Sequence, residues 1–278
     1  KKIIFCSISG YGQTSHWKDR PAYDQIIQGV SGLMSITGDQ ETSPLRAGFP
    51  VADTVGGITA AFAISAALNA KPRGTFIDVS MLEALMSSMG WVVSNYLNTG
   101  VEPIAHGNEN PTSAPSGTFN TSDGLLNIAA NKDKQWQLLT DYLDLAHLRK
   151  NSAYKTREAR KKNRTSLKKE LEKVLGKYPA DKWVKELSEI GVPVSKVLKV
   201  SEILKSEQIV SSGFLTKYQQ VKKVDRDVRV ATTGIKIDGM HPRVSAPPPS
   251  IGEHNDEIFD ELGLSSSDLY NLAKKGIV

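Results

Sequence analysis

The sequence of 278 residues predicts an α/β fold, and three observations lead to this prediction. Lys1–Ile8 has the apolar pattern of a buried strand. A second strand pattern, Thr75–Val79, follows a long apolar helix pattern at Ile58–Leu68 and precedes helical spacing at Met81–Asn95. Such alternation is typical of a sheet with crossover helices, where ligands bind at loops that leave the carboxyl ends of the strands.

Composition limits the class of protein. A hydrophobic fraction of 39% and a charged fraction of 23% are typical of a globular protein. No uninterrupted apolar run reaches the length of a bilayer span, so we expect no membrane partner. The single cysteine, Cys6, excludes an intramolecular disulfide and favours a reducing, cytoplasmic compartment. Its place in an apolar strand predicts an inert core thiol.

The first strand leads into a glycine loop, Ser9-Gly-Tyr-Gly12, which allows the backbone to approach a ligand. His16 follows in a polar segment and is interpreted as a surface histidine. Helical spacing then predicts a helix over Pro21–Met34. Its apolar stripe is expected at Tyr23, Ile26, Ile27 and Val30.

The central stretch of the chain is Phe49–Gly57, in which Asp53 stands just before Gly56, Gly57 and the apolar Ile58–Leu68. A helix with no strongly polar face is expected to be buried on most sides. Asp53 would lie at its N-terminus, where the helix dipole keeps a carboxylate ionised. The two glycines would leave open space beside an anionic oxygen nucleophile. The alternative is that Asp53 only caps a core helix.

Composition changes after Gly100, and a loop rich in Pro, Asn, Ser and Gly spans residues 101–117. A strand at Leu125–Ala129 and helices from Lys132 to about Leu204 follow. We therefore predict domains at residues 1–105, 106–205 and 206–278. Four-residue spacing predicts that the apolar faces of two helices include Leu167, Leu171, Leu175, Trp183 and Leu187. Short strands are predicted at Gly213–Leu215, Val228–Val230 and Gly234–Ile237. Terminal helices are predicted at Asn255–Leu262 and Ser267–Lys274.

Charge is unevenly distributed around a net value of +5. Residues 149–185 hold fourteen Lys or Arg against four Asp or Glu, which is typical of a solvated helical face or of a surface for acidic ligands. Nucleic acid is not favoured as a partner, because stacking aromatics do not interleave with the basic residues. One cysteine and five scattered histidines predict no zinc site. Walker A, Gly-x-Gly-x-x-Gly and Gly-x-Ser-x-Gly motifs do not occur in the sequence.

Several motifs in this order resemble the class III CoA-transferases, also called the formyl-CoA transferase or CaiB/BaiF family, in the superfamily of carnitine dehydratases and 2-methylacyl-CoA racemases. The resemblance covers essentially the whole chain. The motifs that carry it are Cys6-Ser-Ile-Ser-Gly-Tyr-Gly-Gln13, Arg20-Pro-Ala-Tyr-Asp-Gln25, Gly29-Val-Ser-Gly-Leu-Met-Ser-Ile-Thr-Gly38, Pro50-Val-Ala-Asp-Thr-Val-Gly-Gly57, Phe76-Ile-Asp-Val-Ser-Met-Leu-Glu-Ala84, Ala114-Pro-Ser-Gly-Thr-Phe119 and Pro247-Pro-Pro-Ser-Ile-Gly-Glu-His-Asn-Asp-Glu-Ile258.

The resemblance implies a Rossmann-like large domain built from both chain ends, with a small, mainly helical α+β domain inserted between them. It also implies a homodimer whose subunits interlock. The chain opens within a strand pattern and without Met. We therefore expect a C-terminal portion of a longer protein, whose missing N-terminal part supplies most adenine and phosphate contacts of coenzyme A.

By resemblance, Asp53 matches the catalytic aspartate that attacks an acyl-CoA thioester to form a mixed anhydride and then an aspartyl-CoA thioester. Ser9, Gly10 and Tyr11 match a loop that contacts CoA, and Met81 matches a position near the pantetheine arm. Gln13, Gly56 and Gly57 are expected neighbours of the reacting centre. No metal is implied.

The sequence leaves alternatives open for the substrates and for the class of reaction. The residues within these motifs resemble more closely the family members that use succinyl-CoA as donor and a dicarboxylic acid as acceptor. The loop at residues 107–117 lacks a poly-glycine run, which disfavours formate and oxalate. Racemases of the same superfamily use a His-Asp-x-Asn-Tyr motif, whereas Arg20–Asp24 holds no histidine. A non-catalytic binder of acidic ligands, using residues 149–185, is the alternative from a different class.

Overall fold

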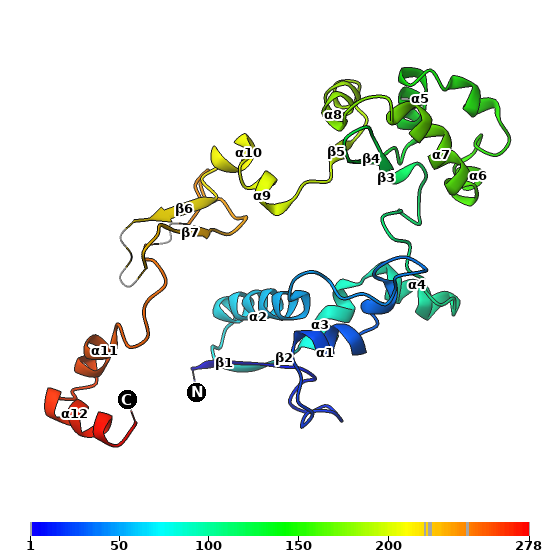
Figure 1. Cartoon of the computed structure of the whole chain (residues 1–278). Coiled ribbons are helices and arrows are strands. Elements are labelled where there is room, and N and C mark those ends of the chain that lie inside the picture. The colour runs from blue at the N-terminus through cyan, green and yellow to red at the C-terminus, as the bar shows by residue number, and fades with distance from the viewer. Residues whose placement is uncertain (1, 220, 222–223, 243–244, 278) are drawn as a thin grey trace. The chain divides into compact units, whose positions relative to one another are not determined.

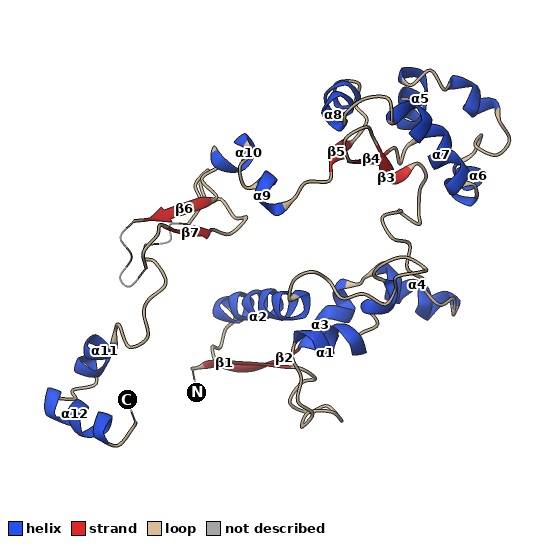
Figure 2. Cartoon of the chain, viewed as in Figure 1, coloured by secondary structure: helices blue, strands red, loops and turns tan. Residues whose placement is uncertain are grey.

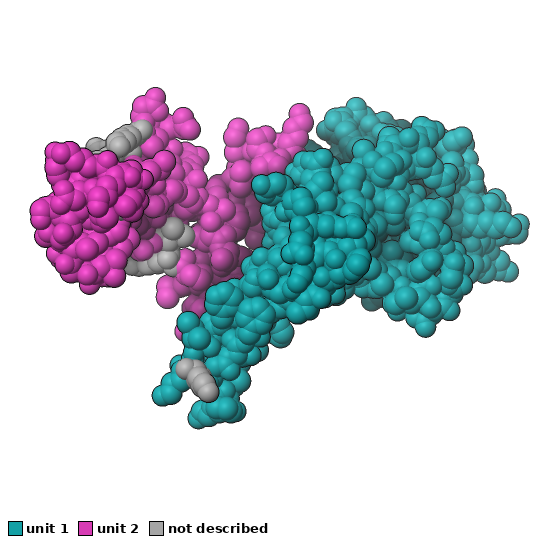
Figure 3. Space-filling model, turned by 90° about the horizontal axis from the view of Figure 1, so that it is seen from below, with its two compact units in different colours: residues 1–197 teal, residues 198–278 magenta. Residues whose placement is uncertain are grey.

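The computed structural model describes residues 2–219, 221, 224–242 and 245–277. It forms two units, Lys1–Val197 and Leu198–Val278, which are coloured separately in Figure 3. Each unit has its own secondary structure. The predicted boundaries at 105/106 and 205/206 stay a prediction.

The first unit begins with the parallel strand pair β1 (Ile4–Ser9) and β2 (Thr75–Ser80), drawn as adjacent arrows in Figure 1. Register runs from Ile4 opposite Thr75 to Ser9 opposite Ser80. Because the strands are parallel and in register, both carboxyl ends lie at one edge of the pair. The helical segments packed with or following them are α1 (Asp24–Val30), η1 (Met34–Ile36), α2 (Val51–Asn69), α3 (Met81–Ser88) and α4 (Trp91–Thr99).

The predicted helix Met81–Asn95 is two helices. Gly90 has a φ of +51°, a left-handed conformation that favours glycine and interrupts the helix between α3 and α4. The predicted helix Pro21–Met34 is also shorter than expected, because α1 ends at Val30 and the 3₁₀ turn η1 begins at Met34.

Of the apolar stripe predicted for α1, only Ile27 is buried. Tyr23 is 83% exposed, and Ile26 and Val30 are also exposed. The buried residues are Asp24, Ile27, Gln28 and Ser31, which follow the i, i+3, i+4, i+7 spacing of one helix face. The inward stripe therefore carries polar side chains that have hydrogen-bond partners in the fold.

Helix α2 is not buried on most sides, as the sequence had suggested. Ala52, Gly56 and Ala60 are its buried residues, whereas Ile58 and Phe62 are 66% and 76% exposed. The elements that contact α2 are β1, β2, α1 and α3, and they cover a single stripe. By length and composition, Val51–Asn69 is long and apolar enough to cross a membrane, although polar residues interrupt its apolar run.

The second half of the first unit packs helices against a three-stranded antiparallel sheet in the order β3-β4-β5 (Figure 2). Strand β4 confirms the predicted strand at Leu125–Ala129, whereas β3 and β5 were not predicted. Their bounds are β3 (Ser116–Asn120), β4 (Leu125–Ala129), α5 (Asp133–Tyr142), η2 (Ala146–Lys150), α6 (Arg157–Lys162), α7 (Arg164–Leu175), α8 (Ala180–Glu189) and β5 (Val194–Lys196). Leu167, Leu171, Leu175, Trp183 and Leu187 all lie in its core, as predicted.

The second unit contains short elements. Strands β6 and β7 pair antiparallel. Strand β7 matches the predicted Val228–Val230, whereas β6 begins at Leu215, the last residue of the predicted Gly213–Leu215. The third, Gly234–Ile237, does not form a strand among the described residues and has one bridge, between Ile237 and Met240. The bounds are α9 (Val200–Ile203), α10 (Glu207–Val210), β6 (Leu215–Tyr218), β7 (Val228–Ala231), α11 (Asn255–Glu261) and α12 (Ser266–Lys274).

Candidate active site

The candidate site lies at the edge of the first unit where β1 and β2 end. The glycine loop leaves β1 at Ser9, and α3 begins directly after Ser80, the residue opposite Ser9 in β2. Tyr11, Ala52 and Met81 belong to one buried cluster with Ile27 and Leu85. The structure therefore brings together the glycine loop, the first turn of α2 and the start of α3, at the edge where α/β proteins bind ligands.

Hydrogen bonds hold the glycine loop in place. The amide of Gly12 donates to Ser9 Oγ at 3.0 Å, and the amide of Gln13 donates to Asp78 Oδ2 at 2.8 Å. The Gln13 side chain donates to Ser7 Oγ at 2.8 Å. Gln13 is therefore occupied in fixing the loop to both strands, although its side chain remains exposed.

Gly10 and Gly56 allow close packing at this edge. A Cβ added at Gly10 would lie 2.5 Å from the Ala22 Cβ, and one added at Gly56 would lie 3.2 Å from the Met81 Cγ. Gly56 thus lets α2 pack against Met81 and does not open space beside Asp53. Gly57 is exposed, and a Cβ there would meet nothing within 4 Å.

Asp53 lies in the first turn of α2 and is exposed, so the buried setting expected for it was wrong. No element within the described residues covers that side of α2. The capping alternative is also wrong, because Asp24 of α1 caps the helix instead. Asp24 Oδ1 accepts from the amide of Ala52 at 2.8 Å, and the amide of Asp53 lies 3.4 Å away. Within the described part of the chain, no donor hydrogen-bonds to the Asp53 carboxylate.

A cavity of about 170 Å³ adjoins the glycine loop. Tyr11, Ser80 and Trp17 line it together with His16, which is exposed, as predicted for a surface histidine. Tyr11 and Trp17 pack edge to face with ring centroids 5.4 Å apart, and the Arg20 guanidinium lies 4.4 Å from the Trp17 ring centroid. This aromatic wall was not foreseen from the sequence, which gave no signal beyond the presence of the side chains.

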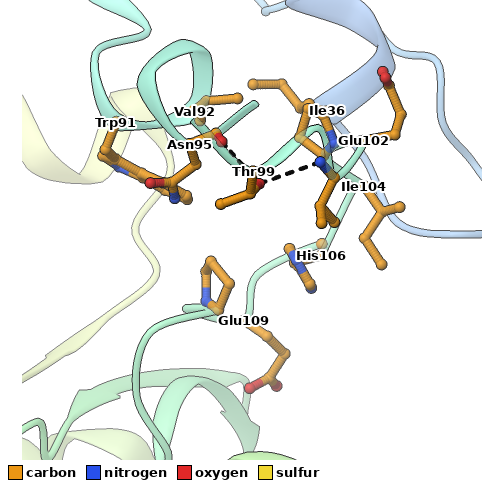
Figure 4. A pocket seen from close by; sticks show the side chains of 13 residues that line it. Ile36, Trp91, Val92, Asn95, Thr99, Glu102, Ile104, His106 and Glu109 are labelled. Carbon is orange, nitrogen blue, oxygen red and sulfur yellow. Dashed lines mark hydrogen bonds between the residues drawn. The ribbon is translucent and has the colours of Figure 1, made fainter. Parts of the chain in front are cut away.

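A larger cavity, of about 810 Å³, lies between α4 and residues 101–111, and none of the predicted site residues lines it (Figure 4). Its wall includes Trp91, Asn95 and His106. Partial burial, followed by the positive charge of Arg164, lowers the pKa of His106 below its usual 6.5. The imidazole is therefore neutral at pH 7 and presents no charge to the cavity.

Part of the basic segment at residues 149–185 faces inward. Three of its arginines donate to backbone carbonyls of the loop that leads to β3: Arg157 to Thr112, Arg160 to Ala114 and Arg164 to Asn110, at 2.8 to 3.1 Å. Arg160 is 1% exposed. These contacts occupy cations that the acidic-ligand alternative would need.

The predicted inert core thiol and the metal-binding potential of the chain can also be checked. Cys6 is free and half-buried, not a core thiol. Among the described residues, no group of three or more His, Cys, Asp or Glu could hold a metal.

Comparison with known proteins identifies the family. The family model of CoA-transferase family III matches residues 1–255, and the chain belongs to this family. It is similar to the human succinyl-CoA:glutarate CoA-transferase, with 31% identity over 265 residues that cover 94% of this chain and 60% of the relative. It is 32% identical over 250 residues to an acetyl-CoA:oxalate CoA-transferase from Acetobacter aceti, covering 88% of this chain and 63% of the relative.

A solved CaiB/BaiF family protein from Brucella suis has a matching fold, with a TM-score of 0.81 and 30% identity over 94% of this chain and 68% of that one. The mixed α/β fold inferred from the sequence is therefore confirmed. The chain spans about three fifths of the length of the human relative.

Proposed function

We propose that this chain carries the nucleophile of an acyl-CoA:carboxylate CoA-transferase, and that Asp53 is that nucleophile. The observation that carries the proposal is the unbonded Asp53 carboxylate, exposed in the first turn of α2 while Asp24 caps the helix. A carboxylate attacks best when its lone pairs are not engaged by donors. The glycine loop Ser9–Tyr11 and Met81 at the same edge are proposed to contact the CoA thioester.

The proposed chemistry proceeds through three covalent intermediates on Asp53, an anhydride with the donor acid, a thioester with CoA and an anhydride with the acceptor acid. The carboxylate attacks the thioester carbonyl of the donor, and the carbon–sulfur bond breaks to give a mixed anhydride and CoA thiolate. The thiolate attacks the Asp53 acyl carbon, which releases the donor acid and leaves an aspartyl-CoA thioester. The acceptor carboxylate then opens this thioester, and the thiolate attacks the new anhydride at the acceptor carbonyl, which restores Asp53.

We propose succinyl-CoA as donor and a dicarboxylic acid as acceptor. Support comes from the name of the human relative, which gives succinyl-CoA and the dicarboxylic acid glutarate. The Acetobacter relative is named for acetyl-CoA and oxalate and shares only a dicarboxylic acid. We further propose a cytoplasmic homodimer with interlocked subunits and a Rossmann-like large domain completed by both chain ends. The free Cys6 thiol supports a reducing compartment.

Trapping with hydroxylamine tests the proposed nucleophile. The full-length protein is incubated with succinyl-CoA and glutarate, quenched with hydroxylamine, digested and analysed by mass spectrometry. We expect a hydroxamate on Asp53 and none in an Asp53→Asn variant. Because the Asp53 side chain is exposed, this substitution should change the free energy of unfolding by no more than about 0.5 kcal/mol.

Two results would contradict the transferase proposal. Deuterium incorporation from solvent at the carbon next to the thioester carbonyl, without a hydroxamate, would assign a racemase. Binding of succinyl-CoA that weakens with salt and is unchanged in Asp53→Asn, again without a hydroxamate, would assign a binder of acidic ligands.

A further inference from the structure

Asp24 is a buried carboxylate that the chemistry of Asp53 leaves without a role. It is the first residue of α1 and is 8% exposed. Its Oδ1 accepts from the amide of Ala52 at 2.8 Å and lies 3.4 Å from the amide of Asp53. A side chain 28 residues away in the sequence thus satisfies amides that the start of α2 leaves unpaired.

Gln28 extends this contact from the next turn of α1. It is fully buried, and its Nε2 donates to Asp24 Oδ2 at 2.7 Å. Its Oε1 accepts from the amide of Ala47 at 2.8 Å. The Arg46 guanidinium lies 3.9 Å from Asp24 Oδ2. Two side chains of α1 therefore hold both ends of residues 46–53, the segment that delivers Asp53 to its helix.

An acidic residue in the first turn of a helix ordinarily turns back to bond an unpaired amide near the helix start. The residue before α2 is Pro50, which has no N–H, and the amide of Val51 donates to the Phe49 carbonyl at 2.8 Å. The amides of Ala52 and Asp53 donate to Asp24 Oδ1 at 2.8 Å and 3.4 Å, so no amide from Val51 to Asp53 is left to compete with a substrate for the Asp53 carboxylate. We propose that Asp24 and Gln28 are positioning residues: they hold the first turn of α2 and keep the Asp53 carboxylate free. The inference rests on the proposed function of Asp53.

The test compares hydroxamate formation on Asp53 in the wild type, Asp24→Ala and a matched control, Asp123→Ala. Asp123 also accepts from a helix-start amide, that of Ala180 in α8, at 2.8 Å, but it lies away from Asp53 in the chain. In Asp24→Ala the Asp53 carboxylate is expected to turn onto the freed amides. The rate of adduct formation with succinyl-CoA should fall roughly 10- to 100-fold, the range for a misplaced reacting group. Asp123→Ala should retain the wild-type rate.

A rescue variant separates positioning from general stability. In Asp24→Asn, the new side-chain NH₂ group would face the Nε2 group of Gln28, and two hydrogen-bond donors would then meet without an acceptor. Adding Gln28→Glu restores an acceptor for that amide and for the amide of Ala47, and it removes only the 3.4 Å hydrogen bond from Gln28 Nε2 to the Phe49 carbonyl. We expect Asp24→Asn to lower kcat with KM for succinyl-CoA unchanged, and the Asp24→Asn/Gln28→Glu variant to recover kcat. If Asp24→Ala does not fold, the comparison of Asp24→Asn with the double variant still tests the positioning role.

The outcomes separate the two proposals. A wild-type protein without an Asp53 hydroxamate would overturn the proposed function itself. A wild-type adduct that forms equally fast in Asp24→Ala would overturn the positioning role alone. So would a loss of activity in Asp24→Asn that the double variant does not reverse, or one that tracks a fall in Tm and disappears at lower temperature.

Discussion

Helix capping and nucleophilic attack place opposite demands on a carboxylate. A cap must be bonded to backbone amides, whereas a nucleophile must present a lone pair that nothing else engages. In this chain Asp24 takes the first task and we propose Asp53 for the second; the two residues meet because α1 packs against the start of α2. A substitution at either position should therefore affect the same reaction through different routes.

The local sequence singled out Asp53 as a candidate, and the resemblance to the family implied its catalytic role, whereas neither pointed to Asp24. An Asp ahead of Gly-Gly and an apolar helix is a short-range pattern, but the bond from Asp24 to Ala52 joins residues 28 apart. One local signal was available. Asp24 and Gln28 are four residues apart and therefore share one face of α1 with Ile27, and this face is the buried one.

His106 should make the stability of the folded chain depend on pH. Its folded-state pKa lies below 6.5, chiefly through partial burial. As pH falls from neutral, the unfolded chain therefore binds a proton first, and the folded chain loses stability below about pH 6.5. We expect urea denaturation to show a smaller loss of stability between pH 7.5 and 5.5 in His106→Gln than in the wild type.

A His254→Gln variant, in the other unit, controls for the loss of one imidazole. An equal change in the pH dependence of both variants would show that the environment of His106 contributes nothing specific.

At the scale of elements, α7 is the best test of how sequence spacing sets the fold. Leu167, Leu171 and Leu175 are four residues apart and fully buried, as their periodicity predicted. We expect Leu171→Ala to lower the free energy of unfolding by about 2 to 5 kcal/mol, because it leaves a cavity in this core. Lys169→Ala, on the exposed side of the same helix, should change it by no more than about 0.5 kcal/mol.

Chemical denaturation followed by the fluorescence of Trp136 and Trp183, both in this core, measures the difference. Equal effects of the two substitutions would contradict the predicted orientation of α7.

Elements whose formation depends on distant pairing were harder to predict than α7. Strands β3 and β5 are short and pair with β4 from opposite sides, and their local composition is that of a loop. Helix α2 shows the reverse error. Its composition is that of a buried helix, but burial depends on what surrounds it, and the elements that contact it cover one stripe.

At the scale of the whole molecule, the exposed apolar surface of α2 is the feature that the proposed homodimer would explain. Ile58 and Phe62 are exposed on this helix, and Phe5 stacks on Phe76 across the strands with both rings more than half exposed. Parallel strands are ordinarily covered on both faces. Ile8 of β1 faces Gly56 of α2, so Phe5 and Phe76 lie on the other face of the strand pair and form a separate exposed apolar surface. An exposed apolar surface such as that of α2 marks protein or membrane contacts.

We expect a second copy of the chain to cover this surface. Light scattering coupled to gel filtration should then give a dimer for the wild type and a monomer for Ile58→Lys/Phe62→Lys, because two lysines in an apolar interface would lose their hydration without partners. Val200→Lys, at an exposed apolar residue of the second unit, should remain dimeric. A monomeric wild type that floats with phospholipid vesicles would instead assign the α2 surface to a membrane, consistent with the length and composition of Val51–Asn69.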